Sequence, residues 1–155
     1  MQASPSAVVA PATTGELADR LLALWKYVAR EAGAELSELL EELDLSMAHV
    51  KTLDALASHA TSPSVKDLST SLRCSLANSS RSVDALVRRG LLERREDDVD
   101  RRVKRLTVTP AGLDALARID GLRLVALETF AQKLSADQRA RLTDALDGLP
   151  LSPAD

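Results

Sequence analysis

The stretch that decides the fold is SVKDLSTSLRCSLANSSRSVDALVRRGLLERREDDVDRRVKRLTVTP, residues 64–110. Ser64 and Ser75 are good helix N-caps, because a serine hydroxyl accepts a hydrogen bond from an unpaired N–H of the first turn. The pattern predicts a short helix, a turn and a second helix, which Gly90 ends. Residues 91–108 then predict two strands joined by the run RREDDVDRR, which is too charged for a core and indicates a solvated hairpin tip.

The same stretch is cationic although the protein as a whole is acidic. Residues 73–105 contain ten basic and six acidic residues, for a local charge of +4. The remainder carries −7, which leaves the formal net charge at −3. A local cationic surface on an acidic protein is the electrostatic footprint expected of an element that binds a polyanion.

Composition predicts a helical, cytoplasmic protein. Of the 155 residues 45% are hydrophobic and only 2% are aromatic, so the core must be built from leucine, valine and alanine. The single cysteine, Cys74, excludes an intrachain disulfide and suits a reducing compartment. No apolar run approaches the roughly 20 residues of a membrane helix, and the N-terminus lacks the pattern of a signal peptide. We therefore expect no membrane partner.

Helices are also predicted on both sides of the cationic stretch. Residues 1–13 are rich in alanine, proline, serine and threonine and are expected to form a disordered tail. Residues 14–45 carry apolar side chains at helical spacing, with Gly33 as the point where one helix bends or two helices meet. Thr109-Pro110 opens a long helix, and Ser46 and Ser135 cap two others. The predicted fold class is mainly α, or α+β, with one small two-stranded sheet.

A helix-turn-helix followed by a two-stranded wing, with long helices at both ends, resembles the MarR family of bacterial transcription regulators. The matching run is residues 74–112, which includes RGLLER before the first strand and Asp100-Arg101-Arg102 in the wing. The order of the helices outside this run also matches, so the resemblance extends over residues 15–149. It implies a winged helix-turn-helix DNA-binding domain at 46–109, between dimerisation helices at 14–45 and 110–149.

The sequence departs from the family pattern at four positions. Val108 stands where leucine is usual, and Arg73 stands at a turn position where glycine is common, so a positive φ there would carry strain. Ser79 and Ser82 replace apolar residues of the recognition helix. These serines either loosen the packing of that helix or change the surface that it presents to DNA.

The resemblance implies that the helix after Ser75 lies in the major groove and that the wing reaches a minor groove. In such a helix Asn78 can read adenine and Arg81 guanine, with Arg81 the leading candidate for a base contact, whereas the wing arginines suit a narrow minor groove. The alternative for Asn78 and Ser80 is a contact with phosphate. Arg102 is expected to enter that groove, and Asp100 to orient a neighbouring arginine. The alternative is that helix and wing are only solvated surface. The DNA-binding candidates are Ser75, Ala77, Asn78, Ser80, Arg81, Arg88, Arg89, Arg94, Asp100, Arg101, Arg102 and Lys104.

The remaining reactive side chains predict no metal site and no cofactor. Cys74 is interpreted as a small buried residue of the turn rather than a redox sensor. His49 and His59 are too far apart to chelate one ion without other ligands, and no Cys/His/Glu cluster has metal-ligand spacing. Trp25 is expected to lie in the core. The resemblance also implies a small aromatic or phenolic effector, for which the candidate residues are Arg20, Trp25, Tyr27 and His49.

The sequence thus predicts a homodimeric regulator that binds a pseudo-palindromic operator in double-stranded DNA. Repression is the default outcome, and release by a small-molecule effector is the expected form of control. An enzyme is not predicted, because the sequence has no nucleophile elbow, glycine-rich phosphate loop or paired acid–base motif. The rival interpretation is a winged-helix module that binds a protein partner, or dimerises, without specific DNA binding.

Overall fold

The computed structural model describes residues 13–59, 61–97 and 99–149. It confirms a mainly α fold with a small antiparallel sheet, in the predicted order of helices and strands. The predicted tail lies outside the described residues except for Thr13, which caps the first helix. The elements are α1 (Thr14–Glu31), α2 (Gly33–Glu42), α3 (Met47–Ala57), α4 (Val65–Ser71), α5 (Leu76–Arg88), β1 (Leu92–Glu96), β2 (Lys104–Val108), α6 (Pro110–Gln132) and α7 (Ala136–Asp147).

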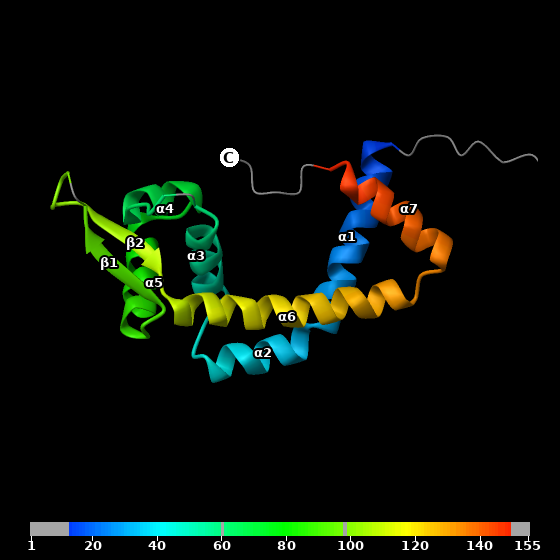
Figure 1. Ribbon diagram of the computed structural model, residues 1–155, viewed down its shortest axis with the longest axis horizontal. Helices are drawn as coiled ribbons and strands as arrows, with labels where there is room; N and C mark the ends of the chain where they lie inside the picture. Colours follow the sequence, from blue (N-terminus) through cyan, green and yellow to red (C-terminus); the bar gives the residue numbers. More distant parts are fainter. Residues whose placement is uncertain (1–12, 60, 98, 150–155) are drawn as a thin grey trace, which may run out of the picture.

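The long helix α6 joins two parts of the molecule (Figure 1). Helices α3, α4 and α5 and the β1–β2 hairpin gather at its N-terminal end, with the hairpin at the periphery. Helices α1 and α7 lie toward its C-terminal end, and α2 lies beside it. At about 1.5 Å per residue, the 23 residues of α6 span roughly 35 Å. The cationic stretch therefore lies at the N-terminal end of the long helix α6.

Side-chain caps begin the helices where the sequence predicts them. Thr109 Oγ1 accepts a hydrogen bond from the Gly112 N–H, and Pro110 stands in the first turn, where it needs no hydrogen-bond partner. Ala32 separates α1 from α2 and Gly33 is the first residue of α2, so the first helical region is two helices rather than one bent helix. Four serines each accept a hydrogen bond from the backbone N–H three residues ahead, namely Ser46, Ser64, Ser75 and Ser135.

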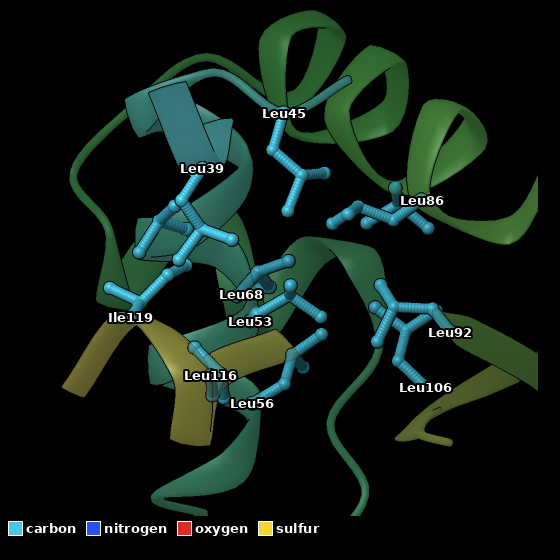
Figure 2. Packing of buried hydrophobic residues seen from close by; sticks show 12 residues of the cluster. Leu39, Leu45, Leu53, Leu56, Leu68, Leu86, Leu92, Leu106, Leu116 and Ile119 are labelled. Carbon is cyan, nitrogen blue, oxygen red and sulfur yellow. The ribbon is translucent and has the colours of Figure 1, made fainter. Parts of the chain in front are cut away.

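The core lies in the winged part of the molecule, where aliphatic side chains from several elements meet (Figure 2). Leu53 of α3, Leu68 of α4 and Leu86 of α5 are fully buried there. Each buried leucine contributes roughly 2 kcal/mol of transfer free energy, so the cluster orients the recognition helix firmly. The remaining core side chains come from α2, the loop before α3, α3 itself, α5, the hairpin and α6, namely Leu39, Leu45, Val50, Leu56, Val83, Leu92, Leu106, Leu116 and Ile119.

The hairpin pairs Leu92 with Val108 and Glu96 with Lys104. The charge of Arg94 and Arg95 predicted that they lie in the solvated tip of the hairpin. Strand β1 instead continues to Glu96, so both arginines lie within the strand. The prediction was wrong because one face of a two-stranded wing is exposed to water and tolerates charged side chains along its whole length. The hairpin is also joined to α4, since the Leu106 N–H donates to the Pro63 carbonyl.

Two glycines are required by the geometry around the hairpin. Gly90 has φ +71°, a left-handed conformation that ends α5 and turns the chain into β1. Gly112, in the first turn of α6, lies against β1: a Cβ at this position would stand 2.3 Å from the Leu91 carbonyl oxygen. This close approach fixes the wing against the long helix.

Large apolar side chains remain exposed on α1, α6 and α7. Trp25 is 67% exposed, so its predicted place in the core is wrong for the described chain. Helix α7 has no buried residue at all. None of the described helices is long and apolar enough to cross a membrane. The large apolar residues exposed at this end of the molecule are Leu17, Leu21, Leu22, Trp25, Leu124, Val125, Leu127, Leu142, Leu146 and Leu149.

Candidate nucleic-acid interface

Helix α5 has one face in the core and one face in solvent. Val83 and Leu86 are fully buried, as their spacing predicts. Leu76, which the same pattern assigns to the inner face, is instead 54% exposed at the first position of the helix. The outer face of its first turns presents side chains that can bind DNA, namely those of Ser75, Ala77, Asn78 and Arg81, with Ser80 half-buried beside them.

The two serines that replace apolar residues lie on the inner side of α5, in a polar seam. Ser79 is buried, with its Oγ 3.0 Å from Cys74 Sγ. Ser82 Oγ lies 3.0 Å from Thr52 Oγ1, and the Thr52 hydroxyl donates to the Ala48 carbonyl of α3. Buried hydroxyls that are hydrogen-bonded cost little, so these serines change how α5 packs on α3 and not what it presents to DNA.

The turn between α4 and α5 carries Arg73 and Cys74. Arg73 has φ +50°, the strained left-handed conformation expected at this position, and its side chain is exposed. Cys74 is exposed, so its interpretation as a buried residue is wrong. Its thiol lies beside the N-terminus of α5, 3.0 Å from Ser79 Oγ, and the residue lines a hollow between α3 and α5.

Asn78 and Arg81 are in direct contact on the outer face. The Arg81 guanidinium donates to Asn78 Oδ1 through Nη2, at 2.5 Å. The Asn78 backbone N–H donates to Ser75 Oγ, so the position of this pair is set by the N-cap of the helix. The two predicted base-reading side chains therefore form one unit.

Three predicted DNA-binding cations already have carboxylate partners. Arg89 is paired with Asp44 and donates to the Ala85 carbonyl, which joins the end of α5 to the loop after α2. Arg94 lies 2.5 Å from Asp84, and Lys104 lies 2.6 Å from Glu96 across the hairpin. Exposed pairs of this kind contribute only about 0–1 kcal/mol, but the nearby carboxylate opposes the approach of a phosphate to each of these cations.

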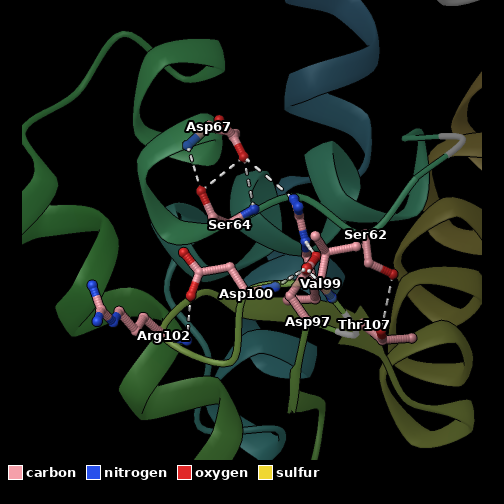
Figure 3. Close-up of polar contacts among 9 residues, drawn as sticks. Ser62, Ser64, Asp67, Asp97, Val99, Asp100, Arg102 and Thr107 are labelled. Atoms are coloured by element: carbon pink, nitrogen blue, oxygen red, sulfur yellow. Dashed lines mark hydrogen bonds and ion pairs between the residues drawn. The ribbon is translucent and has the colours of Figure 1, made fainter.

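The wing loop is organised by Asp97 (Figure 3). Its Oδ1 accepts the backbone N–H groups of Val99 and Asp100, and its Oδ2 accepts from Arg105 Nε at 2.6 Å. The Asp100 N–H first, then the Arg105 guanidinium and the Val99 N–H, lower the pKa of Asp97 to about 2. Arg105 also lies 3.9 Å from Asp67 at the start of α4. The loop is thereby joined to the helix-turn-helix.

Asp100 and Arg102 are in contact, though not through the guanidinium. Asp100 Oδ1 accepts the backbone N–H of Arg102 at 3.0 Å, which shapes the tip of the wing. The side chain of Arg102 extends away from this cluster into solvent (Figure 3). Such a geometry leaves the guanidinium available for a partner outside the chain.

A second set of cations has no carboxylate within 4.0 Å among the described residues. Of the predicted DNA-binding side chains, this set includes Arg81, Arg88, Arg101 and Arg102. It also includes the turn residue Arg73 and two exposed lysines outside the predicted set, Lys51 of α3 and Lys66 of α4. In the sequence, these two lysines are marked as candidates for DNA binding only by their place on the polar faces of the helices that precede α5.

The candidate effector residues are not brought together. A groove of about 480 Å³ between α1 and α6 is lined by Trp25 and by Arg123, together with apolar side chains. His49 instead lines a hollow of about 460 Å³ between α3 and α5, and Tyr27 packs on Phe130 with Lys133 at its hydroxyl. Arg20 is exposed on α1. No group of three or more His, Cys, Asp or Glu among the described residues is placed to hold a metal ion.

Known proteins resemble the chain both in this region and in its fold. A model of the MarR family matches residues 43–103. The transcriptional repressor MprA of Escherichia coli (strain K12) is 40% identical over 68 residues, which are 44% of this chain and 38% of the relative. The match thus spans well under half of the length of the curated relative.

Solved structures resemble the whole chain. RV1404 from Mycobacterium tuberculosis has a TM-score of 0.76 at 20% identity and covers 96% of this chain and 99% of its own. The S. aureus MepR–DNA complex has a TM-score of 0.68 at 20% identity and covers 81% of this chain and 94% of its own. At this level of identity the likeness establishes a shared fold. The family match covers α3, α4, α5, β1 and the wing loop, the same elements that build the candidate interface, and over this region the chain resembles the MarR family.

Proposed function

We propose that the protein is a transcription regulator that binds double-stranded DNA sequence-specifically as a homodimer and represses the genes that it controls. One observation carries the proposal: helix α5 exposes a polar, cationic face, and the wing beside it extends Arg102 into solvent. The family match over 43–103 supports it, as does the name of the related repressor MprA.

In this proposal α5 lies in the major groove and the wing tip lies at the flanking minor groove. Asn78 and Arg81 face base edges, and Arg101 and Arg102 face the minor groove, whose negative potential attracts arginine. Arg73, Arg88, Lys51 and Lys66 surround α5 and suit backbone phosphates. The MepR–DNA complex, which shares the fold, is a precedent for DNA binding by this architecture.

A second copy of the chain is the proposed cover for α1, α6 and α7. Their exposed leucines and Trp25 form a larger apolar surface than a single small protein usually leaves in water. We propose the division into dimerisation helices at 14–45 and 110–149 and a DNA-binding domain at 46–109. A twofold axis through the helices would place two copies of α5 roughly 34 Å apart, one turn of DNA, so that they read a pseudo-palindrome.

Control by a small aromatic acid is proposed for the groove between α1 and α6. Its apolar wall includes Trp25, and Arg123 offers a cation at its edge, 2.9 Å from Asp120 and 3.9 Å from Asp54. A carboxylate that competed for Arg123 would weaken its pair with Asp54 of α3 and so shift α3 relative to α6. Because α6 carries the winged part at its other end, such a shift would favour dimers whose recognition helices no longer match the operator.

Selection of bound sequences from a random duplex pool tests the function. The full-length protein is expected to enrich one motif with two inverted halves whose centres lie about 10 base pairs apart. The rival, a winged-helix module for protein partners, predicts a pool that stays unenriched. An unenriched pool with a correctly folded protein would contradict the DNA-binding function.

A further inference from the structure

The contact between Asn78 and Arg81 determines which hydrogen-bonding groups α5 can offer to a base. A guanidinium carries five N–H donors and no acceptor, so it faces the oxygen of the Asn78 amide and not its NH2 group. One of the two lone pairs of the amide oxygen is thereby occupied, and any further donor to this oxygen has to approach beside the guanidinium cation. The groups that stay free of this contact are the Asn78 NH2 and the other N–H groups of Arg81, which are all donors.

This edge, which is rich in donors and has a cation beside its one acceptor, fits one base better than the others. Guanine presents two acceptors in the major groove, O6 and N7. Adenine presents one acceptor and the N6 amino donor, and cytosine presents the N4 amino donor, so both would bring a donor against donors. Thymine presents one acceptor beside its methyl group. Asn78 alone would suit adenine, because its oxygen would accept from N6 while its NH2 donates to N7.

Building on the proposed DNA-binding function, we propose that Arg81 converts Asn78 from an adenine-reading into a guanine-reading residue, so that the pair selects guanine in each operator half-site. Arg81 thus determines specificity in two ways: it contacts a base itself, and it orients the amide of Asn78. The preference for guanine at the Asn78 position is a property of the pair.

The surroundings of the pair favour its persistence. Asn78 and Arg81 stand three residues apart on α5, so their side chains are neighbours on one helix face. The backbone of Asn78 is held by the Ser75 cap, and no described carboxylate lies within salt-bridge distance of Arg81 to draw it away. The hollow between α3 and α5, about 460 Å³, is lined by both residues and gives them room beside the helix.

The test is the same random-pool selection, run in parallel on the full-length wild-type protein and on Asn78→Ala, Arg81→Ala and Arg88→Ala. Wild type is expected to require guanine at the position that Asn78→Ala relaxes. Arg81→Ala is expected to change that position from guanine to adenine, because the amide oxygen is released, and to lose about tenfold or more in affinity for the wild-type site. A residue that merely supports the helix would not change which base is preferred.

Arg88→Ala is the matched control, because Arg88 is an exposed arginine on the same helix without a described carboxylate partner. It is expected to weaken binding to all sequences alike and to leave the motif unchanged. A second arm replaces the selected guanine with 7-deazaguanine, which lacks the N7 acceptor. Wild type is expected to bind the 7-deazaguanine duplex more weakly than the guanine duplex. Arg81→Ala is measured on the same two duplexes, and its affinity is expected to fall by a smaller factor.

The outcomes separate this inference from the proposed function. An unenriched wild-type pool would contradict DNA recognition itself. An enriched motif with adenine at the Asn78 position, a position unaffected by Asn78→Ala, or a guanine preference that survives Arg81→Ala would each overturn the guanine-reading pair while leaving the regulator in place. Circular dichroism spectra that match wild type establish that each variant is folded.

Discussion

At the scale of single residues, His49 is a titratable group within a helix cap. Ser46 Oγ accepts the His49 N–H, and the Ser46 N–H donates to His49 Nδ1, so each residue satisfies a backbone donor of the other. Burial first, and then the positive charge of Arg89, lower the pKa of His49, against the opposing effect of Asp44. Protonation of Nδ1 would remove the acceptor and open the cap at the start of α3.

The His49 cap predicts a dependence of stability on pH. Because the folded-state pKa lies below the unfolded value of about 6.5, the contribution is present above that value and is lost as the pH falls through the folded-state pKa. Thermal unfolding of wild type and His49→Gln is compared at pH 7.5 and pH 5. Glutamine keeps the reciprocal cap without titrating, so wild type should lose more stability than the variant on acidification. An equal loss in both proteins would contradict this role.

Arg102 is the residue on which the wing contact depends most. Arg102→Ala should weaken binding to the selected operator by roughly five- to hundredfold, the range for loss of one specific arginine contact, and should leave the oligomeric state unchanged. Arg95→Ala is the matched control, since Arg95 is an exposed arginine of the same hairpin already paired with Glu93 at 2.7 Å. Fluorescence anisotropy of labelled duplex measures both. An equal loss of affinity in Arg102→Ala and Arg95→Ala would contradict a specific contact between the wing and DNA.

At the scale of elements, the contact of α6 with the base of the hairpin, at Leu91 and Val108, depends on a glycine. Gly112→Ala would place a Cβ 2.3 Å from the Leu91 carbonyl and 2.7 Å from Val108 Cγ1, and rigid backbone cannot give way as a flexible side chain can. We expect a loss of about 1–3 kcal/mol in the free energy of unfolding. Gly121→Ala, in the same helix with nothing within 4 Å, should instead stabilise by about 0.5–1 kcal/mol. Urea unfolding distinguishes the two; equal shifts would contradict this packing.

The elements were more predictable from sequence than the surface of the site. Serine caps and apolar periodicity are local signals, so the starts of α3, α4, α5 and α7 follow from residues within one turn of each. The pairing of Arg89 with Asp44 joins residues 45 positions apart, and the contact of Arg105 with Asp67 depends on how the hairpin meets α4. Such pairings need the tertiary fold, which a charge count does not contain.

Burial was predicted least well where a second chain is expected. The spacing of Trp25 and the leucines of α1 correctly indicates an apolar stripe, but periodicity cannot say whether a stripe faces the same chain or another one. The exposure of Cys74 has a different origin, because the orientation of a turn residue depends on the strained backbone at Arg73.

At the scale of the whole molecule, the apolar surfaces of α1 and α7 predict a dimer. Leu146→Glu should place a charge in the proposed interface and shift the protein toward monomers, because an unpaired buried charge is strongly destabilising. Leu76→Glu is the matched control, since Leu76 is similarly exposed but lies on α5, and it should remain dimeric. Sedimentation velocity over a concentration series measures the state. A wild-type monomer, or dimers in both variants, would contradict the proposed interface.

In the whole molecule, we propose that α5 and the wing read DNA while the other helices pair two copies. The most direct test measures the affinity of the full-length protein for its selected duplex, and for a shuffled duplex of the same composition, over a series of salt concentrations. We predict that the selected duplex binds at least a thousandfold more tightly at physiological salt, with log affinity falling linearly as log salt rises. Equal affinity for the two duplexes, or no dependence on salt, would contradict the account.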